Sequence, residues 1–430
     1  MQYRSYANYK SSSVDWIGEV PSHWETWKVT HGFGLIGSGT TPKSDNQAYY
    51  EEGETAWITT SELREKEILD TKFKVTKEAL NDYSTLKIYK PGALAFAMYG
   101  ATIGRLGILG INATVNQACC VFDNPEQFYT KFFFYWLWMR RDVLISLSVG
   151  GGQPNLSQDD LKKIRVPIPL IEEQEKIAAF LDYKTQQIDQ LIEKKKALIE
   201  KLEEKRIAVI TQAVTKGLDK NAKLKPSGVD WLGDVPEHWD VRPLKFCCDF
   251  LNNRRIPLSA EDRTGMEKNY PYYGASGIID HVENYIYDEP TILIAEDGAN
   301  LLSRSTDLAF IATGEYWVNN HAHILKPIQG EFGFWSNLLC IVKYEPWVTG
   351  SAQPKLSKEN LGSIPLPYPP LKEQGEISGY IKHELAKIEP MKNKASNVVD
   401  KLQEYRSAII TSAVTGKIDV RAVNIPKAAT

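Results

Sequence analysis

Polar side chains that could read nucleic-acid bases gather in glycine-flanked stretches of two regions, residues 37–117 and 252–321. Arg, Asn and Gln can make paired hydrogen bonds to base edges, while Ser, Thr and backbone amides hold phosphates. The candidates for DNA contact are Thr41, Lys43, Ser44, Thr102, Arg105, Asn116, Gln117, Asn253, Arg254, Arg255, Tyr273, Ser276, Asn300, Asn319 and His321. Turns use many of the same residue types, so turn formation alone also explains a large part of this set.

Residues suited to other chemistry are few. Residues 34–39 are rich in glycine, but they lack the lysine of a phosphate-binding loop, and a plain turn is favoured there. His321 and His323 near Glu296 and Asp297 could hold a metal, although no third ligand has a defining spacing, and a polar surface or core role is favoured. No nuclease motif, serine elbow or Cys–His pairing appears. We therefore predict a protein with no catalytic residues and no metal.

The sequence contains an internal duplication, which indicates that the candidate loops lie in two similar domains. KSSSVDWIGEVPSHW at residues 10–24 returns as KPSGVDWLGDVPEHW at 225–239, a shift of 215. Residues 153–215, including Glu173 and Gln174, return at 353–415, a shift of 200. The ends of each copy are shared, whereas the middles, 31–150 and 246–350, differ. A period near 200 residues predicts a duplicated domain, because solenoid units have about 20 to 50 residues.

Both shared tails have the a/d spacing of a coiled coil, in which apolar residues alternate by steps of four and three. The predicted interface positions are Ile177, Leu181, Ile188, Leu191, Leu198, Leu202 and Val209, then Ile377, Ile381, Ile388, Met391, Val398, Leu402 and Ile409. Pro390 predicts a kink or a late start in the second helix. Antiparallel pairing would bring residues 415–419 beside the N-terminal start and give the molecule a near two-fold axis.

The two middles predict mixed α/β structure, with short strands separated by glycine turns. The expected strands are 93–98, 103–109 and 118–122 in the first middle, and 278–279, 291–295, 309–312 and 324–325 in the second. Packing helices are expected at 136–147 and 334–342. The predicted fold class is therefore α+β, with two mixed α/β domains joined by two long antiparallel helices in a pseudo-two-fold, duplicated chain.

Composition sets the remaining limits. The chain has 430 residues with 43% hydrophobic and 24% charged residues, which excludes a disordered protein. A formal net charge of -3 argues against a protein that holds nucleic acid by charge alone. The five cysteines contain no CxxC pair, so we expect buried thiols in a reducing cytoplasm. Membrane insertion is not expected, since the longest apolar run, 132–139, is far shorter than the roughly 20 residues that a span needs.

These motifs together resemble one family, the specificity (S) subunits of type I restriction-modification enzymes. The resemblance lies in the VDWIGEVPSHW and VDWLGDVPEHW openings and the VPIPLIEEQEKIA and IPLPYPPLKEQ helix entries. It continues in GSGTTP, GATIGR, NQACC, YPYYGASGIID, LIAEDGAN and the closing SAVTGKIDV. Nearly the whole chain is covered, and the combination is specific although no single piece is.

The resemblance implies two target-recognition domains, residues 1–165 and 221–365. Each is followed by a conserved helix, 166–220 and, with the C-terminal tail, 366–430. It further implies that the two domains read unlike halves of a bipartite, non-palindromic site in double-stranded DNA. Two methyltransferase (M) subunits would dock on the helices and methylate adenine, and restriction (R) subunits would bind through them and cut DNA.

The same resemblance implies a subunit that binds no cofactor of its own, with S-adenosylmethionine on the M subunits and ATP and Mg on the R subunits. Two alternatives stay open. One is a specificity subunit of a methylation-only complex without an R partner. The other, from a different class, is a coiled-coil scaffold that binds proteins and no DNA.

Overall fold

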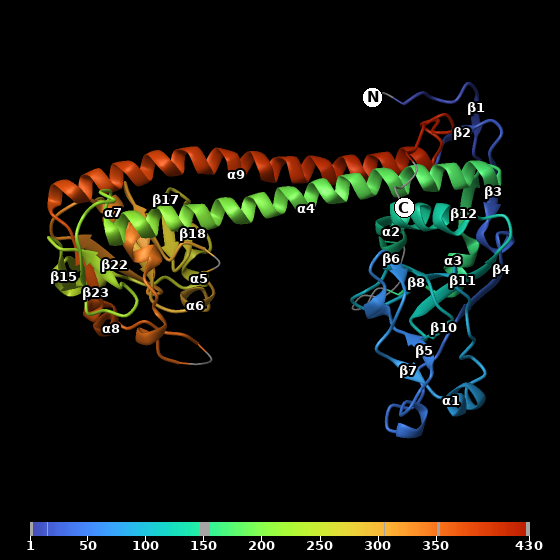
Figure 1. Ribbon diagram of the computed structural model, residues 1–430, viewed down its shortest axis with the longest axis horizontal. Coiled ribbons are helices and arrows are strands. Elements are labelled where there is room, and N and C mark those ends of the chain that lie inside the picture. The colour runs from blue at the N-terminus through green and yellow to red at the C-terminus, as the bar shows by residue number, and fades with distance from the viewer. Residues whose placement is uncertain (1–2, 15, 147–154, 305, 351–352, 427–430) are drawn as a thin grey trace. The chain divides into compact units, whose positions relative to one another are not determined.

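The computed structural model describes residues 3–14, 16–146, 155–304, 306–350 and 353–426 (Figure 1). Asp15 and residues 153–154, which belong to the repeated stretches, lie outside this part of the chain. Two compact units are present, Met1–Lys194 with Val398–Thr430, and Lys195–Asn397. Each contains one variable middle together with one part of helix α4 (Ile171–Lys216) and one part of helix α9 (Leu371–Val414).

The first unit is built on a five-stranded sheet in the order β4-β11-β8-β9-β6. Its strands are β4 (Phe33–Ser38), β11 (Cys119–Pro125), β8 (Leu94–Ala97), β9 (Leu106–Leu109) and β6 (Lys66–Ile68). A three-stranded sheet has the order β10-β5-β7 and consists of β10 (Ala113–Val115), β5 (Thr55–Ile58) and β7 (Lys74–Val75). The helices of this middle are α1 (Lys77–Asp82), α2 (Thr130–Ser146) and α3 (Gln158–Lys163).

The second unit repeats most of this topology, without a counterpart of β6, although its middle has a different sequence. Its larger sheet has the order β16-β22-β19-β20, from β16 (Cys248–Phe250), β22 (Ala322–Pro327), β19 (Thr291–Ala295) and β20 (Ala309–Ala312). Its smaller sheet has the order β18-β17-β21, from β18 (Gly277–Val282), β17 (Tyr270–Gly274) and β21 (Trp317–Val318). The helices are α5 (Ala260–Arg263), α6 (Asn300–Ser303), α7 (Phe332–Ile341) and α8 (Lys358–Ser363).

The shared ends of the repeats form matching strand pairs. In the first copy β1 (Tyr9–Ser11) pairs with β2 (Glu19–Pro21), and β3 (Glu25–Lys28) pairs with β12 (Arg165–Ile168). In the second, β13 (Leu224–Pro226) pairs with β14 (Asp234–Pro236), and β15 (Asp240–Pro243) pairs with β23 (Pro365–Tyr368). The opening of each repeat is thus tied to the strand that leads into its long helix.

The predicted strands and helices of the middles are confirmed, with shifted ends. Helix α2 begins at Thr130, earlier than the expected 136, and residues 291–295 and 309–312 match β19 and β20. The plain turn expected at 34–39 is wrong, because Phe33–Ser38 is strand β4. Its glycines allow close packing instead. A Cβ atom on Gly39 would lie 1.6 Å from the Val115 carbonyl oxygen.

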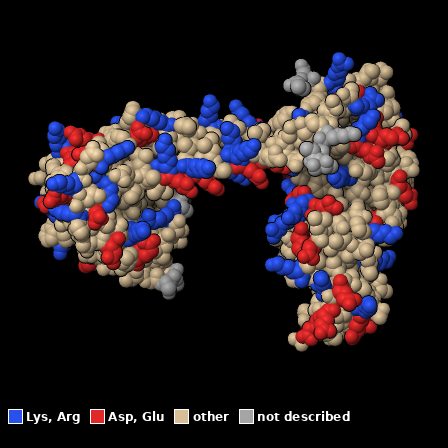
Figure 2. All heavy atoms as spheres, viewed as in Figure 1, with Lys and Arg blue, Asp and Glu red and all other residues tan. Residues whose placement is uncertain are grey.

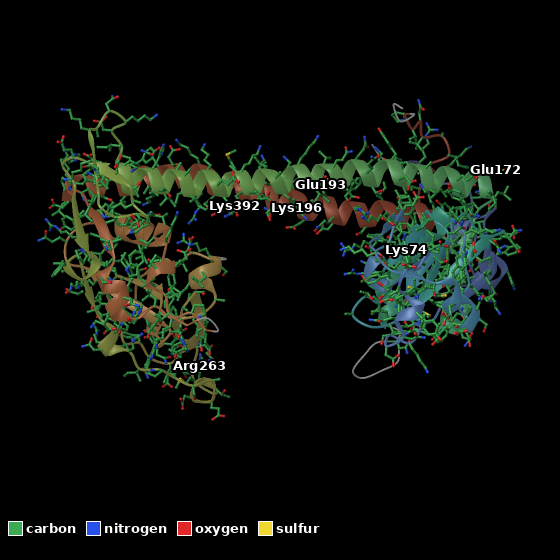
Figure 3. All side chains as sticks on the ribbon, turned by 60° about the horizontal axis from the view of Figure 1, so that its bottom comes forward. Lys74, Glu172, Glu193, Lys196, Arg263 and Lys392 are labelled. Atoms are coloured by element: carbon green, nitrogen blue, oxygen red, sulfur yellow. The ribbon has the colours of Figure 1, made fainter. Side chains whose placement is uncertain are left out.

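Helices α4 and α9 pack against each other and run antiparallel. In the first unit, Arg406 of α9 forms an ion pair with Asp189 of α4 at 2.9 Å. In the second, Lys392 of α9 pairs with Glu203 of α4 at 2.7 Å. Moving 14 residues forward along α4, from 189 to 203, therefore moves 14 residues back along α9, from 406 to 392. Figure 3 shows Lys392 on α9 and Lys196 on α4, with Glu172 near the start of α4.

Burial follows the predicted seam for most of its length. Ile177, Leu181, Ile188, Leu202, Ile377, Ile381, Ile388 and Ile409 are buried, and Val209, Val398 and Leu402 are half-buried. Leu191, Leu198 and Met391 are exposed, so these three do not belong to the buried seam. Ile192, next to Leu191, is buried, and so is Val399, next to the half-buried Val398. A straight helix drifts by about 20° per heptad, so over several heptads the buried stripe moves away from the strict heptad positions. A subunit-interface role for the three exposed residues stays a prediction.

The late start expected from Pro390 is wrong. Helix α9 runs from Leu371 to Val414 with Pro390 inside it. Proline has no N–H to donate to the carbonyl of Ala386, one turn earlier. The neighbouring Ile388 is only 2% exposed. Tertiary packing of this face therefore overrides the local preference.

The chain ends meet in the first unit, as antiparallel pairing predicts. The Asp419 N–H donates to the Arg4 carbonyl at 2.7 Å, and the Tyr9 hydroxyl donates to the Gly416 carbonyl at 3.1 Å. All five cysteines are free thiols, and every one except Cys340 is buried, as expected. Among the described residues, none of the helices has the length and apolar character needed to span a bilayer.

Candidate nucleic-acid interface

One edge of the first unit collects the ends of several strands. Strand β4 ends and β11 begins there, because Ser38 pairs with Cys120. Strand β8 ends and β9 begins at the same edge, as the Phe96–Leu106 pairing requires. Strands β5 and β10 also end there, since β10 leads through residues 116–118 into β11. Residues 39–44, 59–62, 98–105 and 116–118 therefore share one edge, which we call the first loop edge.

The second unit has the equivalent edge. Strand β16 ends beside the start of β22, and β19 ends there too, because Ala295 pairs with Ala322. Strands β17 and β21 end together, through the Tyr273–Val318 pairing, and residues 319–321 lead into β22. Residues 251–256, 275–276, 296–304 and 319–321 form this second loop edge. Every candidate for DNA contact lies on one of the two loop edges or, like Tyr273, near the end of a strand that ends there.

The first loop edge brings Thr41 and Gln117 together from distant parts of the sequence. The Thr41 hydroxyl donates to the side-chain oxygen of Gln117, and both residues are exposed. Next to them, the Asn116 N–H donates to the Ile58 carbonyl at 3.0 Å, while its side-chain oxygen is buried with no partner in the described chain. An unpaired buried oxygen costs about 1 to 3 kcal/mol, so this group is a ready acceptor.

The remaining candidates on this edge are charged or polar residues that are exposed or half-buried. Lys43 and Ser44 are exposed, whereas Thr102 and Arg105 are half-buried. The Arg105 N–H donates to the Thr102 carbonyl at 3.1 Å, which closes the turn between β8 and β9. Its guanidinium forms neither a hydrogen bond nor an ion pair with any residue that the structure describes. This side chain can therefore bind a base or phosphate without breaking an internal contact.

Arg254 and Arg255 of the second loop edge are both engaged in contacts within the protein. Arg255 donates to a Glu296 carboxylate oxygen at 2.6 Å and to the Ala322 carbonyl at 2.9 Å. Arg254 donates to Glu289 at 2.8 Å and lies 4.6 Å from the centroid of the Tyr287 ring. Burial opposes ionisation of Glu296, yet its contact with Arg255 keeps the pKa of that carboxyl below its usual value. These arginines shape the loop, and reading a base would require them to give up these contacts.

Other candidates on this edge also hold its shape. The buried Asn319 accepts a hydrogen bond from the His321 N–H at 2.9 Å, and Asn300 donates to the Thr306 hydroxyl at 2.8 Å. Tyr273 is half-buried, with its ring 5.7 Å from that of Phe310. These side chains make contacts within the protein, and the contacts preorganise the loops.

Asn253, Ser276 and His321 are the candidates that remain exposed on the second loop edge. The His321 Nδ1 lies 2.8 Å from an Asp297 carboxylate oxygen, and the side chain is 48% exposed. Asn320, beside it, is exposed as well. The outward-facing set thus differs from that of the first loop edge in both residue type and position.

The positions of His321 and His323 do not support the alternative that they bind a metal. His323 is buried, with Nε2 2.7 Å from the Leu356 carbonyl oxygen and Nδ1 2.8 Å from the Asn252 side-chain amide. Burial lowers the pKa of His323, so the ring is neutral and donates from Nε2. The described residues contain no cluster of three or more potential metal ligands. The Asn252–His323 pair was missed by sequence reasoning, since nothing in the spacing distinguishes it.

The repeated Glu-Gln and His-Trp motifs form a hydrogen-bonded joint in each unit, buried in the first and partly exposed in the second. Glu173 accepts hydrogen bonds from the Tyr6 hydroxyl at 2.7 Å and the Trp24 indole N–H at 3.0 Å, and lies 2.8 Å from His23 Nε2. In the second unit Glu373 lies 3.0 Å from the Trp239 indole nitrogen and 2.9 Å from His238 Nε2. Recurrence of both motifs at equivalent positions was the signal for this joint, and its role emerges only from the contacts.

Both units carry charges of both signs on the face shown in Figure 2. Figure 2 shows Lys and Arg interspersed with Asp and Glu over the visible face. Residues 1–220 contain 28 basic and 28 acidic residues, and residues 221–430 contain 23 and 26. Neither half of the sequence is a polycation.

The two loop edges thus carry different side chains on a similar framework of strands, within a duplicated chain that has a pair of long helices. The family model described as type I restriction modification DNA specificity domain matches residues 21–201 and 236–399. The chain therefore belongs to the family of type I restriction-modification specificity subunits.

Curated relatives agree with this assignment. A putative type I restriction enzyme specificity subunit of Haemophilus influenzae is 35% identical over 158 residues, which cover 36% of this chain and 37% of the relative. The MjaIX specificity subunit of Methanocaldococcus jannaschii is 31% identical over 42% of this chain and 41% of its own length. The chain thus spans about two fifths of these two relatives. The MjaVIII specificity subunit of the same organism is 24% identical, with 94% and 95% covered.

Solved structures support the fold. A chain solved for the assembly and conformational transition of the type I R-M system superposes with a TM-score of 0.70 at 14% identity, covering 92% of this chain and 98% of that one. The HsdS subunit from Thermoanaerobacter tengcongensis gives a TM-score of 0.51 at 16% identity, with 93% and 98% covered. The predicted fold class, α+β with a duplicated chain and two long helices, is confirmed.

Proposed function

We propose that this chain is the DNA sequence-specificity subunit of a type I restriction-modification complex, and that its two loop edges read the two unlike halves of a bipartite, non-palindromic site. The observation that carries the proposal is one topology with two sets of outward-facing side chains. In the first unit Thr41 and Gln117 are exposed and the half-buried Arg105 keeps an unpaired guanidinium within the described residues, whereas Asn253 and His321 are exposed in the second. Different donors and acceptors select different bases in the major groove.

The internally paired residues support this reading role by keeping the loops rigid. Arg255, Asn319 and Asn300 are each engaged in hydrogen bonds within the second loop edge. A preorganised loop loses less entropy when it binds, and it holds its exposed neighbours at a defined spacing. Asn253 and His321 then carry the discrimination on this edge.

The partners of the complex follow from the same proposal. Two M subunits dock on α4 and α9 and methylate adenine with S-adenosylmethionine, and R subunits that bind ATP and Mg join through them. This chain binds no cofactor itself. Its near-neutral charge supports a division of labour in which the assembled complex supplies most of the affinity for phosphates, and this chain supplies discrimination. A methylation-only complex would use the same loop edges without an R subunit.

The test is to co-express the chain with its M subunits and map methylated adenines by single-molecule sequencing. The expected target has two unlike halves at a constant spacing. Arg105→Ala should relax one half and Asn253→Ala the other, because single base contacts are worth about 1 to 3 kcal/mol of discrimination. Exposed Lys401→Ala is the control and should change neither. If the S–M complex shifts no duplex in the presence of cofactor, the scaffold alternative holds instead.

We further propose that the helix pair sets the spacing between the two halves. Residues 188–194 of α4 lie in register with 401–407 of α9, as the Asp189–Arg406 pair shows. Deleting both segments should shorten the helix pair by about 10 Å, which corresponds to about three base pairs. Methylation mapping should then show loss of the original target, with any remaining sites more closely spaced.

Deleting residues 188–194 alone is the matched control. It should place the apolar positions of α4 out of register with those of α9 and lower the melting temperature. An unchanged spacer in the double deletion would show that the helices are not the ruler.

A further inference from the structure

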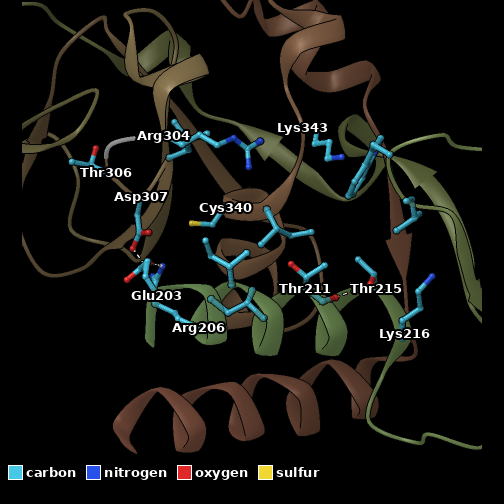
Figure 4. A pocket seen from close by; sticks show the side chains of 16 residues that line it. Glu203, Arg206, Thr211, Thr215, Lys216, Arg304, Thr306, Asp307, Cys340 and Lys343 are labelled. Atoms are coloured by element: carbon cyan, nitrogen blue, oxygen red, sulfur yellow. Dashed lines mark hydrogen bonds and ion pairs between the residues drawn. The ribbon is translucent and has the colours of Figure 1, made fainter. Parts of the chain in front are cut away.

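A cavity of about 360 Å³ lies in the second unit, between the last turns of α4, the end of α7 and the segment before β20 (Figure 4). Figure 4 shows Cys340 of α7 opposite Arg206 and Thr211 of α4. Apolar side chains make up much of the wall, namely Ile207, Ile210, Trp231, Leu232, Leu308 and Ile341.

Comparison of the two repeats shows which side chain occupies the equivalent position in the first unit. Helix α2 begins at residue 130 and α7 at residue 332, an offset of 202. At this offset the fully buried Phe133, Trp136 and Leu137 match the fully buried Trp335, Leu338 and Leu339. The same offset places Trp138 of the first unit at the position of Cys340.

The helix on the other side of the cavity confirms the match. At the offset of 200 residues between the two tails, Arg206 of α4 corresponds to Arg406 of α9. In the first unit the Arg406 guanidinium lies 4.9 Å from the centroid of the Trp138 ring. In the second unit Arg206 and Cys340 both line the cavity. The first unit therefore fills with its own indole the space that the second unit leaves open.

The size of the cavity fits the missing group. Apolar cavities of about 150 Å³ bind benzene, so a cavity of 360 Å³ accommodates an indole ring together with the atoms that carry it. The ring would lie against the isoleucines of α4 with the Arg206 guanidinium within cation–π range, as Trp138 lies with Arg406.

Charged residues at the rim of the cavity determine which groups could lie beside a bound aromatic ring. Glu203 and Asp307 are both engaged by Arg206, at 3.2 and 2.8 Å. Lys216, Arg304 and Lys343 also line the cavity, and none of them forms an ion pair with a residue in the described ranges. Within the described ranges, Lys216 and Arg304 donate to backbone carbonyls, those of Asp234 and Val342. The rim thus presents positive charge that a carboxylate would neutralise.

We propose that this cavity is a docking site for an aromatic side chain flanked by carboxylates, inserted by a protein partner. The site occurs in the second unit, and its counterpart is closed by Trp138. A partner that docks here binds once per chain, because the two repeats differ at this position. The proposal does not depend on which DNA the loop edges read.

The test uses the full chain and two probes, free indole and blocked Asp-Trp-Glu tripeptide, with blocked Lys-Trp-Lys as the control peptide. Calorimetric titration should find one indole site in the unmodified chain. Cys340→Trp should lower indole affinity at least tenfold, and Trp138→Cys should add a second site in the first unit. Cys340→Leu, a smaller filling change, should weaken indole binding partly, and it replaces Cys340→Trp if that variant does not fold.

Asp-Trp-Glu should bind at least tenfold more tightly than Lys-Trp-Lys at low salt, with the difference shrinking at high salt because exposed charges are screened. Equal indole binding by the unmodified chain and the filled variants, or no added site in Trp138→Cys, would overturn the cavity assignment. Equal affinity for the two peptides would overturn the acidic partner.

Discussion

Replacing residues 31–150 with the corresponding region of another family member is expected to change one half of the recognised site and leave the other half intact. This segment supplies every strand end of the first loop edge and none of the second. The two edges belong to separate compact units with their own cores, so a new set of loops in one unit leaves the other unit's contacts unaltered. Single-molecule sequencing of methylated adenines in cells that carry the M subunits measures both halves at once.

The reciprocal replacement of residues 246–350 is the matched experiment and should change only the other half. Spacing should stay constant in both chimaeras, because α4 and α9 are untouched. A single replacement that alters both halves would contradict independent reading by the two loop edges. A chimaera that methylates nothing but melts like the parent chain would also contradict it, since folding would then be intact.

Glu173→Leu is expected to destabilise the first unit by about 2 to 6 kcal/mol, because it leaves two buried donors unpaired at roughly 1 to 3 kcal/mol each. The donors are the Tyr6 hydroxyl and the Trp24 indole N–H, at 2.7 and 3.0 Å from the same carboxylate oxygen. Burial, together with Glu173, raises the pKa of Tyr6, so its hydroxyl remains a donor at every ordinary pH. Denaturant unfolding followed by tryptophan fluorescence measures the loss.

Two further variants separate hydrogen bonding from charge and packing. Glu173→Gln keeps an acceptor oxygen, and it should cost less than Glu173→Leu. Glu172→Leu changes the exposed neighbour at the start of α4, and it should shift stability by less than about 0.5 kcal/mol. Equal effects of the Glu173 and Glu172 substitutions would show that the joint does not hold the opening of the repeat to α4.

The joint also explains why the shared ends of the two repeats resemble each other while the middles do not. Trp24 and Trp239 each meet a glutamate in the first turn of a long helix, and each needs the same side chains to do so. The loop edges face no such requirement, since their outward side chains contact little of the chain itself.

The amino-acid sequence by itself determined the duplication, the antiparallel helix pair, the closeness of the chain ends and the family. These features follow from local sequence patterns, because heptad spacing and recurring motifs can be recognised without knowing which distant residues are in contact. It also identified the loops that gather at the two edges. It did not separate side chains that face outward, such as Asn253, from those held inside, such as Arg255, because both are polar residues in a turn.

Only the tertiary structure decided that two unlike middles share most of one topology. Strand pairings such as Ser38 with Cys120 and Ala295 with Ala322 join segments far apart in the chain, and many sequences satisfy the same pairing. It also moved the buried seam from Leu191 to Ile192, because the true helical period differs from the heptad. The cavity beside Cys340 likewise depends on the volume of one side chain against its neighbours, which becomes visible only where those neighbours meet.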